Sequence, residues 1–527
     1  MADQRIFEPG TRVKLLVNWQ SFVDWGFLTR WKKSFFQAIH NSCQAWNNIG
    51  GTSLRFSTIT EISVSPSIWD LNTGELVIDM GEAILSSDNI LALGGGNFPD
   101  GTPIRGRSKI TFYCKNHNLT PYKWTVAHAD PVENEKDFQA VLIHELGHAC
   151  GLEHSSNDDE IMYEGYKVSD RYGPFMEDIE RLRALYPNFV NNRLKSSYYN
   201  HNNQTWYDRD NNLTTHNTVA QQQHVTRSNH KIGVTDIHNT PLYLLAWNNP
   251  NFQLNTCFGD GIEFLKKRNW TIYYPDTVKS IYGPQLAQDE HGNVLWVWVN
   301  HQHKIKCFRS TDNGMRWTVL NSLPDNKTGS TPGLCCIIVN NIPTWIICWV
   351  NLTRGKTYDS HLGKIKYTVS QDNGATWSAP QVLNENYPFC VQGGLSISAA
   401  DKDHIIILFT QAPINVGEER LNMIQGFGCH LNGTQLNIDR LYSDTSTNRT
   451  DCEPGITYKP SINLFMVVFK DSTSNNIEKG RLKSLILSPQ NSAVGMPVPL
   501  SFYSNNAPTL QFSKRYLEIV LWYPEES

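Results

Sequence analysis

Hydrophobic and polar positions follow two different periods in the first part of the chain. Four stretches have the composition and length of β-strands: "VKLLVNW", "TSLRFSTIT", "GELVIDMG" and "SKITFYC". Residues 28–51 and 134–151 instead carry apolar side chains at helical spacing, and each of these stretches ends at glycine. A last helix is predicted over residues 174–187, between two prolines. Strands and helices mixed within residues 1–187 predict an α+β (or α/β) domain.

The composition changes at residue 188, and a repeat begins at about residue 230. Residues 188–229 are rich in Asn, Gln, His, Ser and Thr, which predicts a linker with one or two strands near its end. From residue 230 to 527, six short apolar runs recur, starting at residues 240, 293, 343, 404, 462 and 516. Trp247, Trp298 and Trp349 lie 51 residues apart. This period predicts an all-β, six-bladed propeller, with the outer strands that close the ring supplied by residues just after the linker or by the linker itself.

Composition narrows the class of protein. A chain of 527 residues, 40% hydrophobic and 18% charged, is typical of two or three globular domains. A formal charge of -4 provides no basic surface for nucleic acid, and no run of eighteen apolar residues predicts a transmembrane segment. The first residues lack the pattern of a secretory leader. The 11 cysteines, several of them inside strand-like runs, are expected to be buried thiols.

The segment "HELGHACGLEH", residues 144–154, carries the clearest chemistry. On a helix, His144 and His148 project from one face, and a break at Gly151 lets the chain bring His154 to the same point. Three neutral imidazoles leave a zinc ion one open position for water, as in catalytic sites. Glu145 can then take a proton from that water, which predicts hydrolysis of an amide. The alternative is a helix with surface histidines, which the five fixed positions of the extended pattern disfavour.

This motif and the residues that follow it resemble the metzincin zinc proteases, and among them the matrixin group. Met162 matches the family's Met-turn, Ser155 follows the third histidine, and Tyr163 follows the methionine, as in matrixins. The resemblance implies a catalytic metalloprotease domain over residues 1–187 with one catalytic zinc. It also implies that Met162 lies beneath the zinc site and that residues 164–174 line the specificity pocket.

Departures from the matrixin pattern change two expectations. Residues 86–110 contain no histidine, so the family's second, structural zinc site is predicted to be absent. No cysteine-switch motif is present, and nothing in the sequence supports a calcium requirement. The resemblance implies extracellular action. The missing leader is then consistent with non-standard export, with delivery by a secretion apparatus as for a toxin or effector, or with a trimmed chain.

Two turns in the repeat region share the pattern Ser-x-Asp-x-Gly-x-x-Trp. Their residues are Ser310, Asp312, Gly314 and Trp317, and then Ser370, Asp372, Gly374 and Trp377. In a hairpin turn the aspartate can accept backbone N–H bonds, the glycine can adopt positive φ, and the tryptophan can pack the turn down. The pattern resembles the Asp box (BNR repeat) of sialidase-type propellers, where it is structural and not catalytic.

Two functions stay open for the whole chain. The first is a zinc-dependent endopeptidase acting on a protein or peptide substrate, with the propeller recruiting a glycan, a glycoprotein or a protein. The second is a glycan-binding or sialidase-like protein in which the propeller carries the main activity. Residues 230–247, at the start of the propeller, contain no arginine and no Phe/Tyr-Arg-Ile-Pro motif, which disfavours a sialidase. The oligomeric state does not follow from the sequence.

Overall fold

The computed structural model describes residues 3–47, 52–82, 90–95, 104–126, 135–167, 170, 173–187, 192–200, 205–208, 233–237, 243–248, 254–259, 279–320, 323, 326–352, 363–387, 394–411, 423–443, 450, 452–471, 480–490, 497–504, 507–513 and 518–526. They fall into two units, one within Met1–Phe189 and one within Val190–Leu352, Gly363–Ala412 and Leu421–Ser527. Among these residues, no helix has the length and apolar character needed to cross a membrane.

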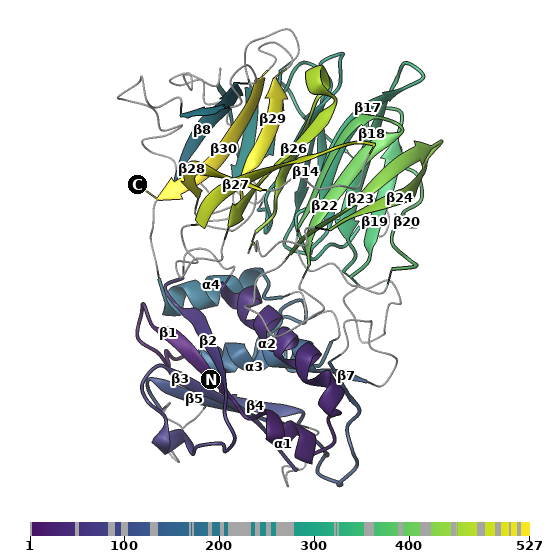
Figure 1. The fold of residues 1–527 in the computed structure, drawn as a ribbon. Helices are drawn as coiled ribbons and strands as arrows, with labels where there is room; N and C mark the ends of the chain where they lie inside the picture. Colours follow the sequence, from purple (N-terminus) through teal and green to yellow (C-terminus); the bar gives the residue numbers. More distant parts are fainter. Residues whose placement is uncertain are drawn as a thin grey trace. The chain divides into compact units, whose positions relative to one another are not determined.

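The first unit is built on a five-stranded sheet with the order β2-β1-β3-β5-β4 (Figure 1). Its strands are β1 (Arg12–Val17), β2 (Arg55–Glu61), β3 (Glu75–Gly81), β4 (Ala92–Gly95) and β5 (Arg107–Tyr113). β1, β2, β3 and β5 run parallel, whereas β4 runs antiparallel to β5 at the end of the sheet. Two short strands, β6 (Trp124–Thr125) and β7 (Lys136–Asp137), form a separate parallel pair.

An aromatic cluster joins this sheet to three helices. The helices of the unit are α1 (Trp19–Asp24), α2 (Lys32–Asn47), α3 (Phe138–Ala149) and α4 (Met176–Leu185). Phe35 of α2 lies 4.6 Å from Phe22 of α1 and 4.7 Å from Phe138 of α3, measured between ring centroids. Phe112 of β5 lies 4.7 Å from Phe138. Because such pairs each add about 0.5–1.5 kcal/mol beyond area burial, the cluster fixes the start of α3 against the sheet.

Further bonds hold α3 along its length. The Asp137 carboxylate caps the helix by accepting the backbone N–H of Ala140 at 3.0 Å. Trp46 of α2 donates its indole N–H to the carbonyl oxygen of Ile143 at 2.9 Å. α3 is therefore fixed at its N-terminus by a cap and along one side by α2.

Within the described residues, the second unit forms six antiparallel sheets (Figure 1). The first three comprise β10 (Gly233–Asp236), β11 (Tyr243–Asn248) and β12 (Leu254–Gly259); β13 (Gln285–Gln288), β14 (Val294–Val299), β15 (Ile305–Ser310) and β16 (Thr318–Val319); and β17 (Gly333–Val339), β18 (Ile342–Val350), β19 (Ile365–Ser370) and β20 (Gln381–Val382). The next two comprise β21 (Leu395–Asp401), β22 (His404–Gln411), β23 (Met423–Asn432) and β24 (Gln435–Ser443); and β25 (Gly455–Lys459), β26 (Leu464–Asp471), β27 (Gly480–Leu487) and β28 (Val498–Ser504). The last comprises β29 (Thr509–Ser513), β30 (Glu518–Glu526), β8 (Asn192–Asn200) and β9 (Thr205–Asp208).

The six apolar runs of the sequence form the second strand of each sheet, namely β11, β14, β18, β22, β26 and β30. The first strands of successive sheets contact one another in chain order, and β29 of the last sheet also contacts β10 of the first. Gln511 of β29 donates to the carboxylate of Asp236 of β10 at 3.3 Å. Among the cysteines whose side chains are described, nine are free thiols and eight of these are buried, as expected for packed thiols.

The last sheet takes its outer strands from the polar segment 188–229. β8 pairs with β30, and β9 pairs with β8. Both strands lie at the beginning of this segment; the strands predicted near its end fall on residues 209–229, which lie outside the described residues. The ring of Tyr199 of β8 is buried in an apolar cluster with side chains such as Leu510 and Leu521 of β29 and β30, which packs β8 into the last sheet.

A second repeat, which hydrophobic spacing does not reveal, precedes several of the first strands. In three turns a hydroxyl donates to the carbonyl oxygen two residues later: Ser280 to Tyr282 (2.6 Å), Thr328 to Ser330 (3.0 Å) and Thr450 to Cys452 (3.0 Å). A proline follows four residues after each hydroxyl. These buried polar groups are satisfied inside their own turns, so they serve local structure.

Candidate metal centre

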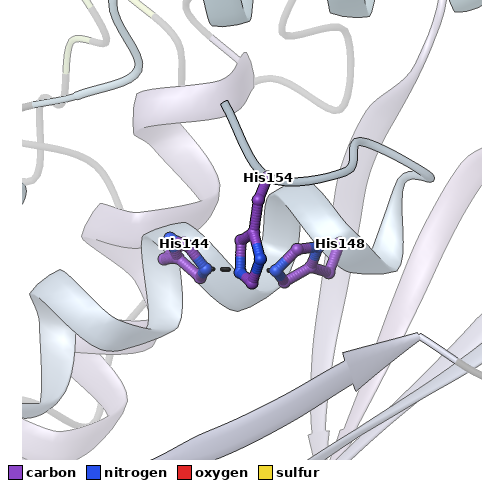
Figure 2. Close-up of side chains that lie close together, drawn as sticks. All are labelled: His144, His148 and His154. Carbon is purple, nitrogen blue, oxygen red and sulfur yellow. Dashed lines mark hydrogen bonds between the residues drawn. The ribbon is translucent and has the colours of Figure 1, made fainter. Parts of the chain in front are cut away.

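Three histidines from α3 and the loop after it converge on one point (Figure 2). His144 and His148 lie one turn apart on α3, and His154 follows the end of the helix. Their ligand nitrogens all lie within 4.8 Å of one another, and Nε2 of His144 is 3.1 Å from Nε2 of His148. Zinc–nitrogen bonds of about 2.0–2.1 Å in a tetrahedron would separate two ligand atoms by about 3.4 Å. The spacing of the imidazoles therefore suits one zinc ion.

Hydrogen bonds fix the tautomers of two of these rings. Nδ1 of His144 lies 2.7 Å from the carbonyl oxygen of Ile161, and Nδ1 of His148 lies 2.7 Å from that of Leu152. A carbonyl oxygen only accepts, so each Nδ1 carries the proton and, in a neutral ring, each Nε2 is an unprotonated acceptor. Two such nitrogens 3.1 Å apart repel each other unless a cation lies between them. The residues present therefore fit a bound metal ion.

Burial favours the neutral form of both rings. Loss of surrounding water lowers the pKa of His144 to about 4 and the pKa of His148 to about 3. Zinc binds the neutral imidazole, so these two ligands need lose no proton at neutral pH. His154 differs in that its side chain is exposed.

Glu145, which follows His144 on α3, has a carboxylate oxygen without a protein partner. Its side chain is buried, its carboxylate accepts the backbone N–H of Gly94, and its Oε2 has no hydrogen-bond partner among the described residues. Burial raises the pKa of Glu145 to about 8, and a cation bound at the histidines would favour the ionised form again. A buried acceptor without a partner is costly, so Oε2 is a site for a water molecule or a substrate group.

Gly94 of β4 passes directly over Glu145. A Cβ atom at this position would lie 2.5 Å from the backbone oxygen of Glu145 and 2.9 Å from Oε2. Only glycine allows this approach, so β4 can lie this close to α3 only with glycine at position 94. The run of three glycines at 94–96 is the one sequence signal for this contact.

Met162 lies against α3 at Gly147. It is fully buried, and a Cβ atom on Gly147 would lie 2.3 Å from its sulfur. The buried carboxylate of Asp178 of α4 accepts the backbone N–H groups of Ile161 (2.8 Å) and Met162 (3.3 Å). α4 therefore holds the turn that carries the methionine. Spacing along the sequence does not identify Asp178 as a support for this turn. The one signal in the sequence is its position in the first turn of a helix, where acidic residues are favoured.

Gly151 turns the chain from α3 towards His154. Its φ is +98°, and a Cβ atom here would lie 1.7 Å from the carbonyl oxygen of Gln4. Its N–H donates to the carbonyl oxygen of His148 at 2.9 Å. Glycine is therefore required both for the backbone conformation and for the close approach of the N-terminal segment.

The described part of residues 164–174 is tied to the start of α3. The hydroxyl of Tyr166 accepts the backbone N–H of Asp137 at 2.7 Å, and Lys136 Nζ lies 4.7 Å from the centre of the Tyr166 ring. Residues 168–169 and 171–172 of this segment lie outside the described residues. So do residues 86–89 and 96–103 of the stretch in which a second zinc site is predicted to be absent.

The two Ser-x-Asp-x-Gly-x-x-Trp turns of the second unit share one hydrogen-bond pattern. In the first, Ser310 Oγ donates to Asp312 (2.7 Å) and accepts the N–H of Gly314 (2.9 Å), while Asp312 accepts the N–H of Arg316 (2.8 Å). The corresponding distances in the second turn, at Ser370, Asp372 and Gly374, are 2.8, 2.9 and 2.8 Å. Gly314 and Gly374 have φ of +84° and +78°, and Trp317 packs 5.4 Å from Trp296. The Trp377 side chain is partly buried.

Of four arginines within residues 230–527 that could bind an acidic sugar, one lies within the described residues. Arg440 donates to the carbonyl oxygen of Pro489 at 2.7 Å. Arg354, Arg420 and Arg449 lie outside the described residues.

Comparison with known proteins bears on the first unit. Residues 97–187 match the family described as Matrixin. The chain is similar to Metalloendoproteinase 5-MMP of Arabidopsis thaliana, at 29% identity over 118 residues, covering 20% of this chain and 33% of that protein. It is also similar to Interstitial collagenase B of Mus musculus, at 37% identity over 67 residues, covering 12% and 13%. The chain thus spans a third or less of these relatives, and the resemblance to matrixin-like proteases is confirmed for this region.

Among solved structures, the chain is similar to the GH93 alpha-L-arabinofuranosidase of Fusarium graminearum in complex with arabinobiose. The TM-score is 0.38 at 11% identity, covering 56% of this chain and 94% of that chain. It is also similar to the SapL1 lectin in complex with alpha methyl fucoside, with a TM-score of 0.36 at 12% identity, covering 55% and 85%. Both likenesses are weak and do not bear on what this chain binds.

Proposed function

We propose that the first unit is a zinc-dependent endopeptidase, with zinc held by His144, His148 and His154. The observation that carries this proposal is the convergence of three imidazoles on one point, together with a buried carboxylate oxygen without a protein partner on Glu145, the residue that follows His144 on α3. When bound, zinc supplies Lewis acidity, which acidifies a water molecule and polarises the carbonyl group of the substrate. The match of residues 97–187 to the Matrixin family supports the same class of reaction.

Glu145 performs the proton transfers in this proposal. Its Oε2 accepts a proton from the attacking water, and the carboxyl group then donates a proton to the amide nitrogen as the C–N bond breaks. The N–H of Gly94 orients the carboxylate.

The edge of the sheet favours an extended peptide as the substrate. β4 is the last strand, and in the described part of the chain its outer edge pairs with no strand. Gly94 brings this strand next to Glu145. A peptide that pairs with a free strand edge gains main-chain hydrogen bonds whatever its side chains are. This geometry supports a protein or peptide substrate rather than a small amide.

For the second unit we propose a six-bladed β-propeller that recruits the substrate by binding a glycan, a glycoprotein or a protein. The succession of six sheets, and the bond from Gln511 back to Asp236, support a closed ring. The two Ser-x-Asp turns then act as structural Asp boxes, because their polar groups bind one another.

The proposal is tested by cleavage of casein, of a peptide library and of a sialoside reporter. We compare the parent with Glu145→Ala and with the control Glu61→Gln, which alters an exposed carboxylate of the same unit. Proteolysis is expected in the parent and the control, to be abolished by a chelator, and to return with added zinc. Proteolysis that persists in Glu145→Ala would contradict the proposal. Sialoside turnover that persists in this variant would assign an activity to the second unit instead.

A further inference from the structure

The third histidine is held differently from the other two. His144 and His148 each bond a carbonyl oxygen through Nδ1, which orients their rings. No hydrogen bond from the described part of the chain orients the exposed ring of His154, whose ring contacts are with the other two histidines. The position of His154 therefore depends on the backbone that leads to it. Whatever fixes that backbone also fixes the third ligand.

Two side chains from distant parts of the sequence hold the residue before His154. The backbone N–H of Glu153 donates to Asp3 Oδ1 at 2.9 Å, and Arg181 Nη2 donates to the Glu153 carbonyl oxygen at 2.7 Å. Arg181 also bonds Asp3 directly, through Nε to Oδ2 at 2.8 Å and through Nη2 to Oδ1. Both backbone groups of Glu153 are thus held by one bidentate ion pair. The two side chains are only 18% and 22% exposed, so solvent screens this pair less than a surface pair.

The neighbouring contacts extend the same support. The N–H of Gln4 donates to the carbonyl oxygen of Gly151 at 2.9 Å. The hydroxyl of Tyr186 accepts the N–H groups of residues 6 and 7, both at 3.1 Å, and donates to the carbonyl oxygen of Cys150 at 2.8 Å. Residues 3–7 therefore follow the whole turn from the end of α3 to Glu153.

We propose that Asp3 and Arg181 are positioning residues for the third metal ligand. By fixing the backbone of Glu153, they hold His154 where it completes the site with His144 and His148. Without them, the turn after α3 would have to be ordered when the metal binds, and the affinity for zinc would fall. Outer partners of metal ligands typically change metal affinity about 10–100-fold when they are removed. The inference rests on the proposed function, because it takes His154 as a zinc ligand.

Two substitutions test whether Asp3 and Arg181 position the metal ligand or only anchor the N-terminal segment. Asp3→Ala removes the acceptor of the Glu153 N–H. Arg181→Lys keeps a positive charge near Asp3 but lacks the planar fork that reaches Asp3 and the Glu153 carbonyl oxygen together. The matched control is Glu75→Gln at the start of β3. The Glu75 carboxylate likewise accepts a backbone N–H, from Asn72 at 3.0 Å, and pairs with Lys14 at 3.5 Å.

The experiment measures the zinc affinity of the full chain by competition with a chromogenic chelator, and the Tm of the zinc-free protein. Asp3→Ala and Arg181→Lys are each expected to weaken zinc binding about 10–100-fold, while Glu75→Gln binds zinc like the parent. If both variants bind zinc within about threefold of the parent, the proposal is overturned even where Tm falls, because the pair is then only an anchor. A parent chain that binds no zinc would instead overturn the proposed function, a result that the same titration distinguishes.

Discussion

The candidate metal centre of the first unit and the Ser-x-Asp turns of the second use polar side chains in opposite ways. The candidate centre collects groups from α3, the loop after it and the backbone of β4, and it leaves Glu145 Oε2 without a protein partner. Each turn instead satisfies its serine and aspartate within eight residues. Both regions carry a short motif of fixed spacing, so spacing alone does not distinguish a reactive site from a structural turn. The distinguishing feature is that several elements converge on polar atoms without hydrogen-bond partners.

The largest effect expected from this contrast is the loss of activity in Glu145→Gln. This change keeps the size of the side chain but removes the general base, so peptide hydrolysis should fall about 10²–10⁴-fold. Zinc binding should persist, because the three histidines are unchanged. The measurement is kcat/KM on a short peptide, together with the zinc content of the same sample. Activity within tenfold of the parent, about 1.4 kcal/mol, would remove Glu145 from the mechanism.

The next effect concerns glycines of positive φ in the two units. At Gly151 a new methyl group meets the strain of φ +98° and the Gln4 carbonyl oxygen at 1.7 Å. Gly151→Ala should therefore lower the free energy of unfolding of the first unit by about 2–5 kcal/mol, from strain and overpacking together.

The matched control is Gly433→Ala in the second unit. Gly433 has φ +62° and nothing within 4 Å of the added methyl group, so it should cost about 1–2 kcal/mol from backbone strain alone. Urea unfolding of both variants, followed by tryptophan fluorescence, gives the two values. Equal losses would show that contact with the N-terminal segment contributes nothing at Gly151.

What the sequence predicts, and what it does not, follows from the range of each contact. His144 and His148 lie on one face because the helical period is local, and the apolar runs mark the second strands because each run is a continuous segment. Gly94 over Glu145, and Asp3 with Arg181 around Glu153, join residues that only the order of strands and helices brings together. The pairing of β8 with β30 likewise spans more than three hundred residues of the sequence. No period along the chain encodes such contacts.

A smaller effect is expected in the pH dependence of the zinc-free protein. Glu145 has a pKa of about 8 in the folded chain and a lower one when unfolded, so the folded state binds the extra proton between these values. Stability should therefore fall as pH rises from 6.5 to 8, by about 2 kcal/mol. The two buried histidines affect stability at lower pH. Folding lowers the pKa of His144 to about 4 and that of His148 to about 3, so the unfolded chain binds more protons as pH falls below about 6.5, and stability decreases.

Glu145→Gln separates the two contributions. The chelated variant should lose the decline between pH 6.5 and 8 and keep the decline at lower pH, because the histidines remain. Urea midpoints of the chelated parent and the chelated variant at pH 5, 6.5 and 8 make the comparison. Parallel profiles for the two proteins above pH 6.5 would show that the carboxyl group does not titrate in this range.

The smallest effect is expected in the Ser-x-Asp turns, where polar groups serve the fold. Burial opposes the ionisation of Asp372, but bonds from the side chain and backbone of Thr376 and from Ser370 outweigh it, and its pKa lies below the usual value. A lowered folded pKa contributes stability above the unfolded value of about 3.9, and this stability is lost as pH falls through the folded pKa. Since Asp372 is exposed, Asp372→Asn should lower the free energy of unfolding by well under about 1 kcal/mol at pH 7. It should also weaken the loss of stability of the second unit at acid pH.

Asp312→Asn is the matched control. Thr376 Oγ1 bonds the Asp372 carboxylate at 2.5 Å, whereas Arg316 gives Asp312 a backbone bond, so the free energy of unfolding should change less in the control. Loss of peptide hydrolysis in either variant would contradict a purely structural role for these turns.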